Sequence, residues 1–203
     1  MAEGKGNTRT AVVIVIELAI ALAVVMLPIP IPAMILLLAA VMVALALRGL
    51  SFVDLGLDAE RWQVMVPAGL LLGGLVAAIL FAIAGPVPGG EMLLVEGNGR
   101  ALLAALLVGA ATAMVSEVVF RGYVIHRMQP ALGKIGVPVG VLIGGVLSAL
   151  VSHPDTLAEG FGILVFSTGY ALLYLASKHK LLLPFVMHFA IDAHGVIIEY
   201  LGM

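Results

Sequence analysis

Long apolar stretches alternate along the chain with short breaks that are polar or rich in proline and glycine. A helix that crosses a bilayer needs about 20 mostly apolar residues. By that length the sequence predicts membrane-spanning helices at roughly 11–27, 33–48, 63–84, 101–128, 136–153, 160–177 and 181–200. The breaks carry residues that end helices, such as the prolines of 28–32 and the Gly–Pro segment 85–90. We therefore expect an all-α, polytopic transmembrane bundle of about seven helices, with residues 1–203 forming a single membrane domain.

Composition narrows the class of protein in the same direction. Of the 203 residues, 63% are hydrophobic and 11% are charged, whereas soluble domains are about 45–50% apolar and about 25% charged. The chain has no concentration of basic residues of the kind that a nucleic-acid partner requires. It also has no cysteine, which excludes disulfides and thiolate chemistry. We therefore expect the lipid bilayer to be the main partner of the chain.

The basic residues predict an orientation. If the predicted helices alternate in direction, eight of the ten basic residues fall on the side of the N-terminus: Lys5, Arg9, Arg48, Arg61, Arg127, Lys134, Lys178 and Lys180. This segregation is typical of a cytoplasmic N-terminus. The first apolar run, 11–27, is longer than the apolar core of a typical signal peptide and leads into the prolines of 28–32 with no small-residue cleavage site after it, so we expect a retained helix and not a signal peptide. We expect a multi-pass integral protein of a prokaryotic cytoplasmic membrane.

A few polar residues interrupt the spans and suggest chemistry. Glu117 and Arg121 lie four apart in the fourth span, His188 and Asp192 lie four apart in the seventh, and His153 ends the fifth. Ionisable groups within spans are functional candidates. A carboxylate and an imidazole from separate helices can deprotonate a water molecule, and a second imidazole can stabilise an oxyanion. These groups are the minimum needed to hydrolyse a peptide bond within a membrane.

Structural interpretations of the same residues stay open. Glu117 and Arg121 can simply neutralise each other, since residues four apart on a helix are neighbours. His153 can be an interfacial residue at a helix end, and His188 with Asp192 can be a structural pair. Helix counting puts Glu117, His153 and His188 at different depths, so a catalytic interpretation requires that they converge.

Two other patterns have mainly packing interpretations. Gly69 with Gly73, and Gly140 with Gly144, form G-x-x-x-G spacings that favour close contact between helices. His194 lies two residues beyond Asp192 and is expected on another face of the last helix.

The order and spacing of the polar motifs resemble the CPBP intramembrane proteases, which include the eukaryotic CAAX prenyl endopeptidases and bacterial ABI-type proteins. That family carries E-E-x-x-x-R on one helix, F-x-x-x-H on the next and H-x-x-x-N/D on a later one. The matching residues here are Glu117, Arg121 with Gly122, His153, His188 and Asp192. The stretch Asp54-Leu55-Gly56-Leu57 also resembles a family segment, and the resemblance covers roughly residues 50 to 195.

Two positions depart from the family pattern. Ala149 stands where the second motif has Phe, and Ser116 stands where the first motif has its first Glu. In the family that Glu is usually regarded as the residue that activates the catalytic water. A serine hydroxyl cannot act as a general base at neutral pH. The altered position Ser116 therefore bears directly on whether the chain can catalyse hydrolysis.

The resemblance implies an intramembrane endopeptidase that uses activated water to cleave a membrane-associated protein or peptide. In that version Glu117 and His153 position the water, His188 and Asp192 stabilise the oxyanion, and Arg121 holds Glu117. The alternative is a catalytically impaired protein of the same fold that serves as a binding or regulatory scaffold. A transporter is disfavoured, because no pair of broken helices occupies matching halves.

No cofactor is expected, although a divalent metal such as zinc is not excluded. Glu117, His153 and His188 can supply nitrogen and oxygen ligands with an open position for water. The H-E-x-x-H motif of zinc proteases is absent from the sequence.

Overall fold

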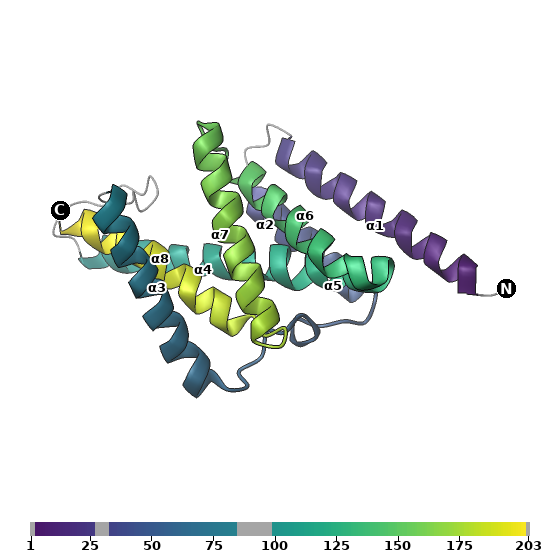
Figure 1. Ribbon diagram of the computed structural model, residues 1–203, viewed down its shortest axis with the longest axis horizontal. Helices are drawn as coiled ribbons and strands as arrows, with labels where there is room; N and C mark the ends of the chain where they lie inside the picture. Colours follow the sequence, from purple (N-terminus) through teal and green to yellow (C-terminus); the bar gives the residue numbers. More distant parts are fainter. Residues whose placement is uncertain (1–2, 27–32, 85–98, 202–203) are drawn as a thin grey trace.

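The computed structural model describes residues 3–26, 33–84 and 99–201, and every regular element in these ranges is a helix (Figure 1). The predicted all-α membrane helical bundle is thereby confirmed. The α-helices are α1 (Glu3–Met26), α2 (Ala33–Ala46), α3 (Trp62–Ala84), α4 (Gly99–Ser116), α5 (Val124–Leu132), α6 (Gly136–Val151), α7 (Leu157–Ala176) and α8 (Leu182–Tyr200). Three shorter helical segments are η1 (Val53–Leu55), η2 (Glu117–Tyr123) and η3 (Gly133–Ile135).

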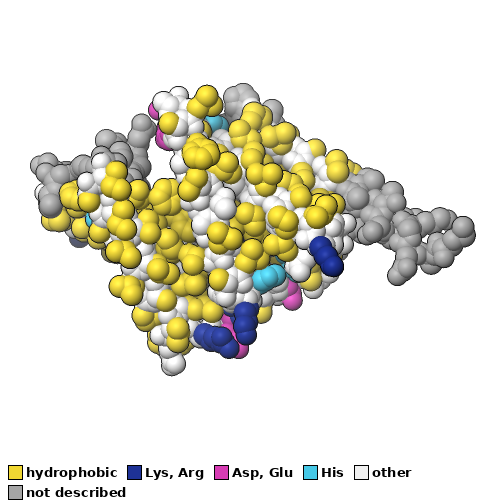
Figure 2. All heavy atoms as spheres, viewed as in Figure 1, with side chains coloured by type: hydrophobic (Ala, Val, Ile, Leu, Met, Phe, Trp, Pro, Cys, Tyr) yellow, Lys and Arg dark blue, Asp and Glu magenta, His cyan; other side chains and the backbone are white. Residues whose placement is uncertain are grey.

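The surface is largely apolar, as a bilayer requires. On α3, Leu71 is 74% exposed and Ile83 is 80% exposed. Figure 2 shows hydrophobic side chains over most of one face, with Lys and Arg gathered mainly along its lower edge. Water would penalise so much exposed apolar area, whereas lipid tails do not.

The number of membrane crossings remains a prediction. Among the described residues, four stretches are long and apolar enough to cross a membrane: 62–83, 99–151, 157–176 and 182–200. The second of these runs through α4, η2, α5, η3 and α6, so it is not one straight helix. Shorter apolar stretches lie in α1 and α2, at 13–24 and 33–46.

Helix α3 lies along α8, and together they form the end of the molecule opposite α1 (Figure 1). Glycines permit this contact. A Cβ atom on Gly69 would lie 2.8 Å from the Cβ of Val186, and one on Gly73 would lie 2.6 Å from the Cβ of Ala190. The first G-x-x-x-G pattern therefore packs helices closely, as predicted.

The second glycine pattern brings α6 against η2 and α5. A Cβ on Gly144 would lie 2.6 Å from the carbonyl oxygen of Phe120, and one on Gly140 would lie 3.0 Å from the Cα of Ile125. Both predicted glycine contacts are thus present, and the second holds a neighbouring helix against the segment that carries Glu117 and Arg121.

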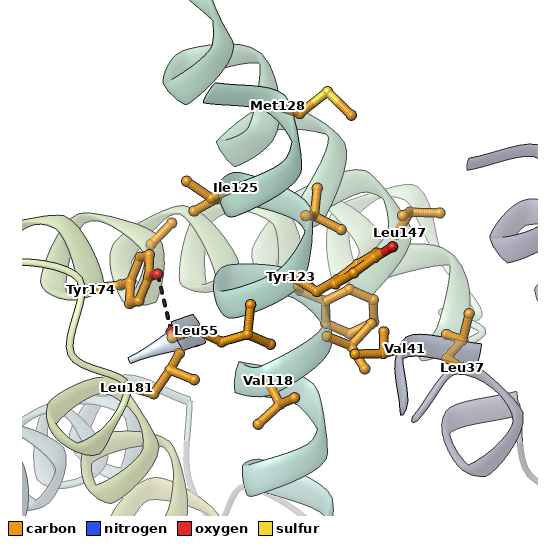
Figure 3. Packing of buried hydrophobic residues seen from close by; sticks show 14 of the residues in the cluster. Leu37, Val41, Leu55, Val118, Tyr123, Ile125, Met128, Leu147, Tyr174 and Leu181 are labelled. Carbon is orange, nitrogen blue, oxygen red and sulfur yellow. Dashed lines mark hydrogen bonds between the residues drawn. The ribbon is translucent and has the colours of Figure 1, made fainter. Parts of the chain in front are cut away.

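The buried core is built around η2, whose seven residues are all buried. Figure 3 shows Val118 of this region near Leu55, and Tyr123 near Val41 of α2 and Leu147 of α6. The sequence predicted one uninterrupted span over 101–128. The observed chain changes from α-helix to a π-helix at Glu117 and continues as α-helix to Leu132. A π-helical turn closes i to i+5, is rare, and frequently occurs at functional sites.

The polar stretch before α3 is partly buried. Leu55 is fully buried, and its carbonyl accepts a hydrogen bond of 3.2 Å from the Tyr174 hydroxyl (Figure 3). The carbonyl of Gly56 accepts a 2.9 Å bond from the backbone N–H of Leu181. Gly56 has a φ of 93°, and the His179 carbonyl occupies the space that a Cβ would need. Residues 54–57 are therefore fixed to the connection between α7 and α8.

Candidate active site

The π-helix η2 buries an ion pair. Glu117 is 0% exposed and Arg121 is 2% exposed, and Arg121 Nη1 lies 3.3 Å from Glu117 Oε1. The predicted contact between these residues is therefore present. Removing either charge would leave the other buried without compensation, which is costly in a medium of low dielectric constant.

Arg121 is also held by α7. Its Nη2 donates to the Ser167 hydroxyl at 2.7 Å and to the Ser167 carbonyl at 3.2 Å. Its guanidinium carbon lies 5.2 Å from the centre of the Tyr170 ring. These contacts fix the guanidinium plane, and with it the position of the Glu117 carboxylate.

His188 of α8 bridges two carboxylates. Its Nδ1 lies 2.9 Å from Glu117 Oε1, and its Nε2 lies 3.6 Å from Asp192 Oδ2. In the neutral ring, a proton on Nδ1 can be donated to Glu117, which leaves Nε2 as an acceptor. The ring also stacks on Tyr170, with centroids 4.7 Å apart and planes 14° apart. Four predicted site residues therefore come together: Glu117, Arg121, His188 and Asp192.

Exposure differs across this group in a way that limits their roles. The Glu117 side chain is 0% exposed, that of His188 is 20% exposed and that of Asp192 is 39% exposed. A molecule approaching the site meets Asp192 and the Nε2 side of His188 before it meets Glu117. Glu117 Oε2 and Arg121 Nη1 are buried and have no hydrogen-bond partner within the described part of the chain. Buried atoms of this kind need a special explanation, such as a role in the chemistry or an ordered water.

His153 does not join the group. It follows the end of α6, is exposed and has a φ of 46°. Across residues 3–26, 33–84 and 99–201, no hydrogen bond or ion pair connects its side chain with Glu117 or His188. The convergence that the catalytic interpretation required is therefore met by Glu117 and His188 but not by His153.

Ser116, the altered motif position, is the last residue of α4 and is 9% exposed. Its side chain caps no backbone group of η2. His194 packs edge-on against Phe81 of α3, with ring centroids 6.0 Å apart, and so lies on another face of α8 as predicted.

The donor groups do not fit the metal site considered from the sequence. That site needs Glu117, His153 and His188 around one ion, but His153 is exposed and not joined to the other two, and Glu117 is hydrogen-bonded directly to His188. Among the described residues, no group of three or more His, Asp or Glu side chains is arranged to hold a metal. The expectation that no metal is required stays a prediction.

A second polar cluster, which the sequence analysis missed, lies beside the opposite end of η2. Glu17 of α1 pairs with Arg48 and, at 3.1 Å, with Arg127, while Arg48 donates to the Tyr123 hydroxyl at 3.2 Å. The available signal was a single carboxylate within the apolar run 11–27. Ser167 and Tyr170 were visible as polar residues within a span, but their contacts with the site were not predicted.

Comparison with known proteins links the same region to one family. Residues 98–194 match the model of a family described as type II CAAX prenyl endopeptidase Rce1-like. The matched segment contains Glu117, Arg121, His153, His188 and Asp192. No curated protein and no solved structure matches the chain.

Proposed function

Because the chain belongs to the CPBP family through its Rce1-like segment, residues 98–194, we propose that it is an intramembrane endopeptidase that hydrolyses a peptide bond of a membrane-associated protein or peptide. The family is one of CAAX-type intramembrane proteases. The observation that carries the proposal for this chain is the 2.9 Å contact between Glu117 Oε1 and His188 Nδ1, next to Asp192.

The contact supports His188 as the general base. With its Nδ1 proton donated to Glu117, the ring presents Nε2 toward the exposed side of the site. A water bonded to Nε2 and to Asp192 Oδ2 gives its proton to Nε2 as its oxygen attacks the carbonyl carbon. The resulting imidazolium is stabilised by Glu117. It then protonates the leaving nitrogen as the C–N bond breaks, which yields a carboxylic acid and an amine.

This assignment changes the roles that the family resemblance implies. Glu117 is fully buried, so it acts through His188 and does not touch the attacking water. Arg121 balances the charge of Glu117. His153 receives no role, because it is exposed and, within the described part of the chain, makes no hydrogen bond or ion pair with Glu117 or His188.

A binding or regulatory scaffold is the second candidate. Two observations favour it: Ser116 stands at the position of the family's usual base, and His153 is not in contact with Glu117. In this version the Glu117–His188 pair only joins η2 to α8, and the protein binds a membrane peptide without cleaving it.

The orientation of the chain forms part of the proposal. The N-terminus is cytoplasmic and the protein resides in a prokaryotic cytoplasmic membrane, with lipid and a membrane-associated substrate as its partners. The segregation of basic residues supports this, since Arg61, Lys178 and Lys180 flank the start of α3 and the end of α7.

The deciding experiment is cleavage of a pooled membrane-peptide library by the protein in liposomes. Activity that is lost in Glu117→Gln and His188→Ala but kept in His194→Ala supports the peptidase, because His194 lies on another face of the same helix. Activity that appears only in Ser116→Glu means that the present chain is disarmed. Peptide binding without cleavage in every variant favours the scaffold.

A further inference from the structure

Helix α7 presents two buried polar residues to the site. Ser167 is 3% exposed and Tyr170 is 5% exposed, and the two lie three residues apart on one face of the helix. Ser167 accepts a hydrogen bond from Arg121, and the Tyr170 ring contacts both the Arg121 guanidinium and the His188 ring. One helix thus contacts both the segment that carries Glu117 and the helix that carries His188.

The stack supplies a constraint that the hydrogen bond alone does not. Rotation about the second side-chain torsion of histidine is soft, so a bond at Nδ1 leaves the plane of the ring poorly fixed. The Tyr170 ring lies nearly parallel to His188 at 4.7 Å and thereby sets that plane. The bond at Nδ1 and the stack together determine where Nε2 points.

The contacts of Tyr170 with the site are made by its ring and not by its hydroxyl. Within the described part of the chain, its hydroxyl makes no hydrogen bond, and its ring contacts the His188 ring and the Arg121 guanidinium. Phenylalanine would keep the stack, whereas leucine would keep apolar volume and remove the stack. The chain therefore offers a matched pair of substitutions.

We propose that Tyr170 and Ser167 are positioning residues of the active site. Tyr170 fixes the ring plane of His188, and Ser167 fixes Arg121 and, through it, Glu117. This inference rests on the proposed peptidase function for its kinetic consequence, but the contacts themselves can be tested without catalysis.

The experiment compares Tyr170→Phe, Tyr170→Leu and Ser167→Ala in liposomes and in detergent. Tyr170→Leu is expected to lower kcat by about tenfold or more with KM little changed, because small misplacements of a catalytic group are costly. Tyr170→Phe should retain the parent kcat. Ser167→Ala should lower kcat less than Tyr170→Leu does, since Arg121 Nη2 can still donate to the backbone carbonyl of this residue. Thermal unfolding of each variant identifies any that simply fail to fold.

Nuclear magnetic resonance of isotope-labelled histidine provides the readout that does not need activity. The chain has five histidines, and His188→Gln identifies the relevant signals. The parent and Tyr170→Phe should show ring protons of His188 shifted upfield by the stacked ring, together with an Nδ1 proton bonded to Glu117. Tyr170→Leu should lose the upfield shift and weaken the Nδ1 signal.

The outcomes separate the two proposals. If the parent cleaves and Tyr170→Leu keeps its kcat, the positioning role is overturned while the peptidase stands. If the parent cleaves no substrate, the peptidase proposal fails, but the resonance data still test the positioning role of Tyr170. An Nδ1 signal unchanged in Tyr170→Leu then overturns the positioning role, and its loss supports that role.

Discussion

His188 Nδ1 lies 2.9 Å from Glu117 Oε1, although the two residues are 71 positions apart in the sequence. The contact joins η2, at the centre of the core, to α8, which packs on α3. Any change that moves either element should therefore affect both stability and the proposed reaction.

Both neutralising and removing the Glu117 carboxylate should destabilise the protein, because either change leaves Arg121 buried without its countercharge. We expect a loss of about 3 kcal/mol or more in the free energy of unfolding for Glu117→Ala. Glu117→Gln retains a hydrogen-bond acceptor for His188 and should cost somewhat less. Denaturant unfolding in mixed micelles measures both. Parent-like stability in both variants would contradict the buried ion pair.

The glycines of α3 allow a matched test of helix packing. A Cβ on Gly73 would lie 2.6 Å from Ala190 Cβ, whereas one on Gly74 would meet nothing within 4 Å. Gly73→Ala should destabilise the protein by about 1–3 kcal/mol and lower cleavage, because α8 carries His188. Gly74→Ala should match the parent in unfolding and cleavage assays. If both substitutions are neutral, α3 and α8 are not in tight contact.

The connection before α3 should respond to acid. Hydrogen bonds from Lys180, 2.6 Å to Asp58 and 2.7 Å to Glu60, hold the pKa of each carboxyl below its ordinary value. The stabilisation is thus present above the ordinary carboxyl pKa and is lost as the pH falls through the lower, folded-state pKa. Hydrogen exchange of residues 57–61, corrected for intrinsic rates, should show protection that declines in acid.

Lys180→Met is the control for that measurement, since it keeps an apolar stem and removes the charge. The acid-dependent part of the protection should disappear in this variant. The bond from the Ser51 backbone to Asp54, which lowers the pKa of the Asp54 carboxyl independently, should be unaffected. Protection that declines equally in parent and variant would assign the effect to other groups.

The second polar cluster should hold α1 against the bundle. Glu17→Gln removes the carboxylate that Arg48 and Arg127 share, and we expect a loss of about 1.5–3 kcal/mol in the free energy of unfolding, the range for hydrogen bonds to charged groups. Digestion of the protein by an added protease should separate α1 from the bundle faster in this variant. The variant should still cleave its own substrate, because Glu17 has no contact with His188 among the described residues. An unchanged proteolysis rate would show that α1 is held by apolar packing alone.

The absence of cysteine makes the orientation directly measurable. Single substitutions Lys178→Cys and Asp155→Cys lie at opposite ends of α7. An impermeant thiol reagent added to intact cells should label Asp155→Cys only, and inverted vesicles should give the reverse. Labelling of Lys178→Cys from outside would reverse the predicted orientation.

Much of the fold was predictable because it depends on local patterns. Apolar run length located the helices, and the spacing of Gly69 with Gly73 identified a helix contact. The pairing of Glu117 with Arg121 followed from their separation of four residues. The change to π-helix at Glu117 was not predictable, because residues 101–128 contain no proline and their length and composition predict one continuous helix.

Contacts between distant segments explain the other differences. Spacing along one chain cannot show that His188 meets Glu117 while His153 does not, since this depends on the tilt and depth of three helices. Glu17 was overlooked because its partners, Arg48 and Arg127, lie in other elements. The role of Tyr170 emerges only from ring geometry.

The complete burial of Glu117 has a consequence for the design of inhibitors. Among the described residues, the ion-pair partners of Glu117 are Arg121 and His188, and only the His188 side chain is partly exposed. A molecule that binds the exposed part of the site therefore contacts the imidazole and not the Glu117 carboxylate. An inhibitor of this site should accordingly be built to bond to Nε2 of His188 and to the carboxylate of Asp192.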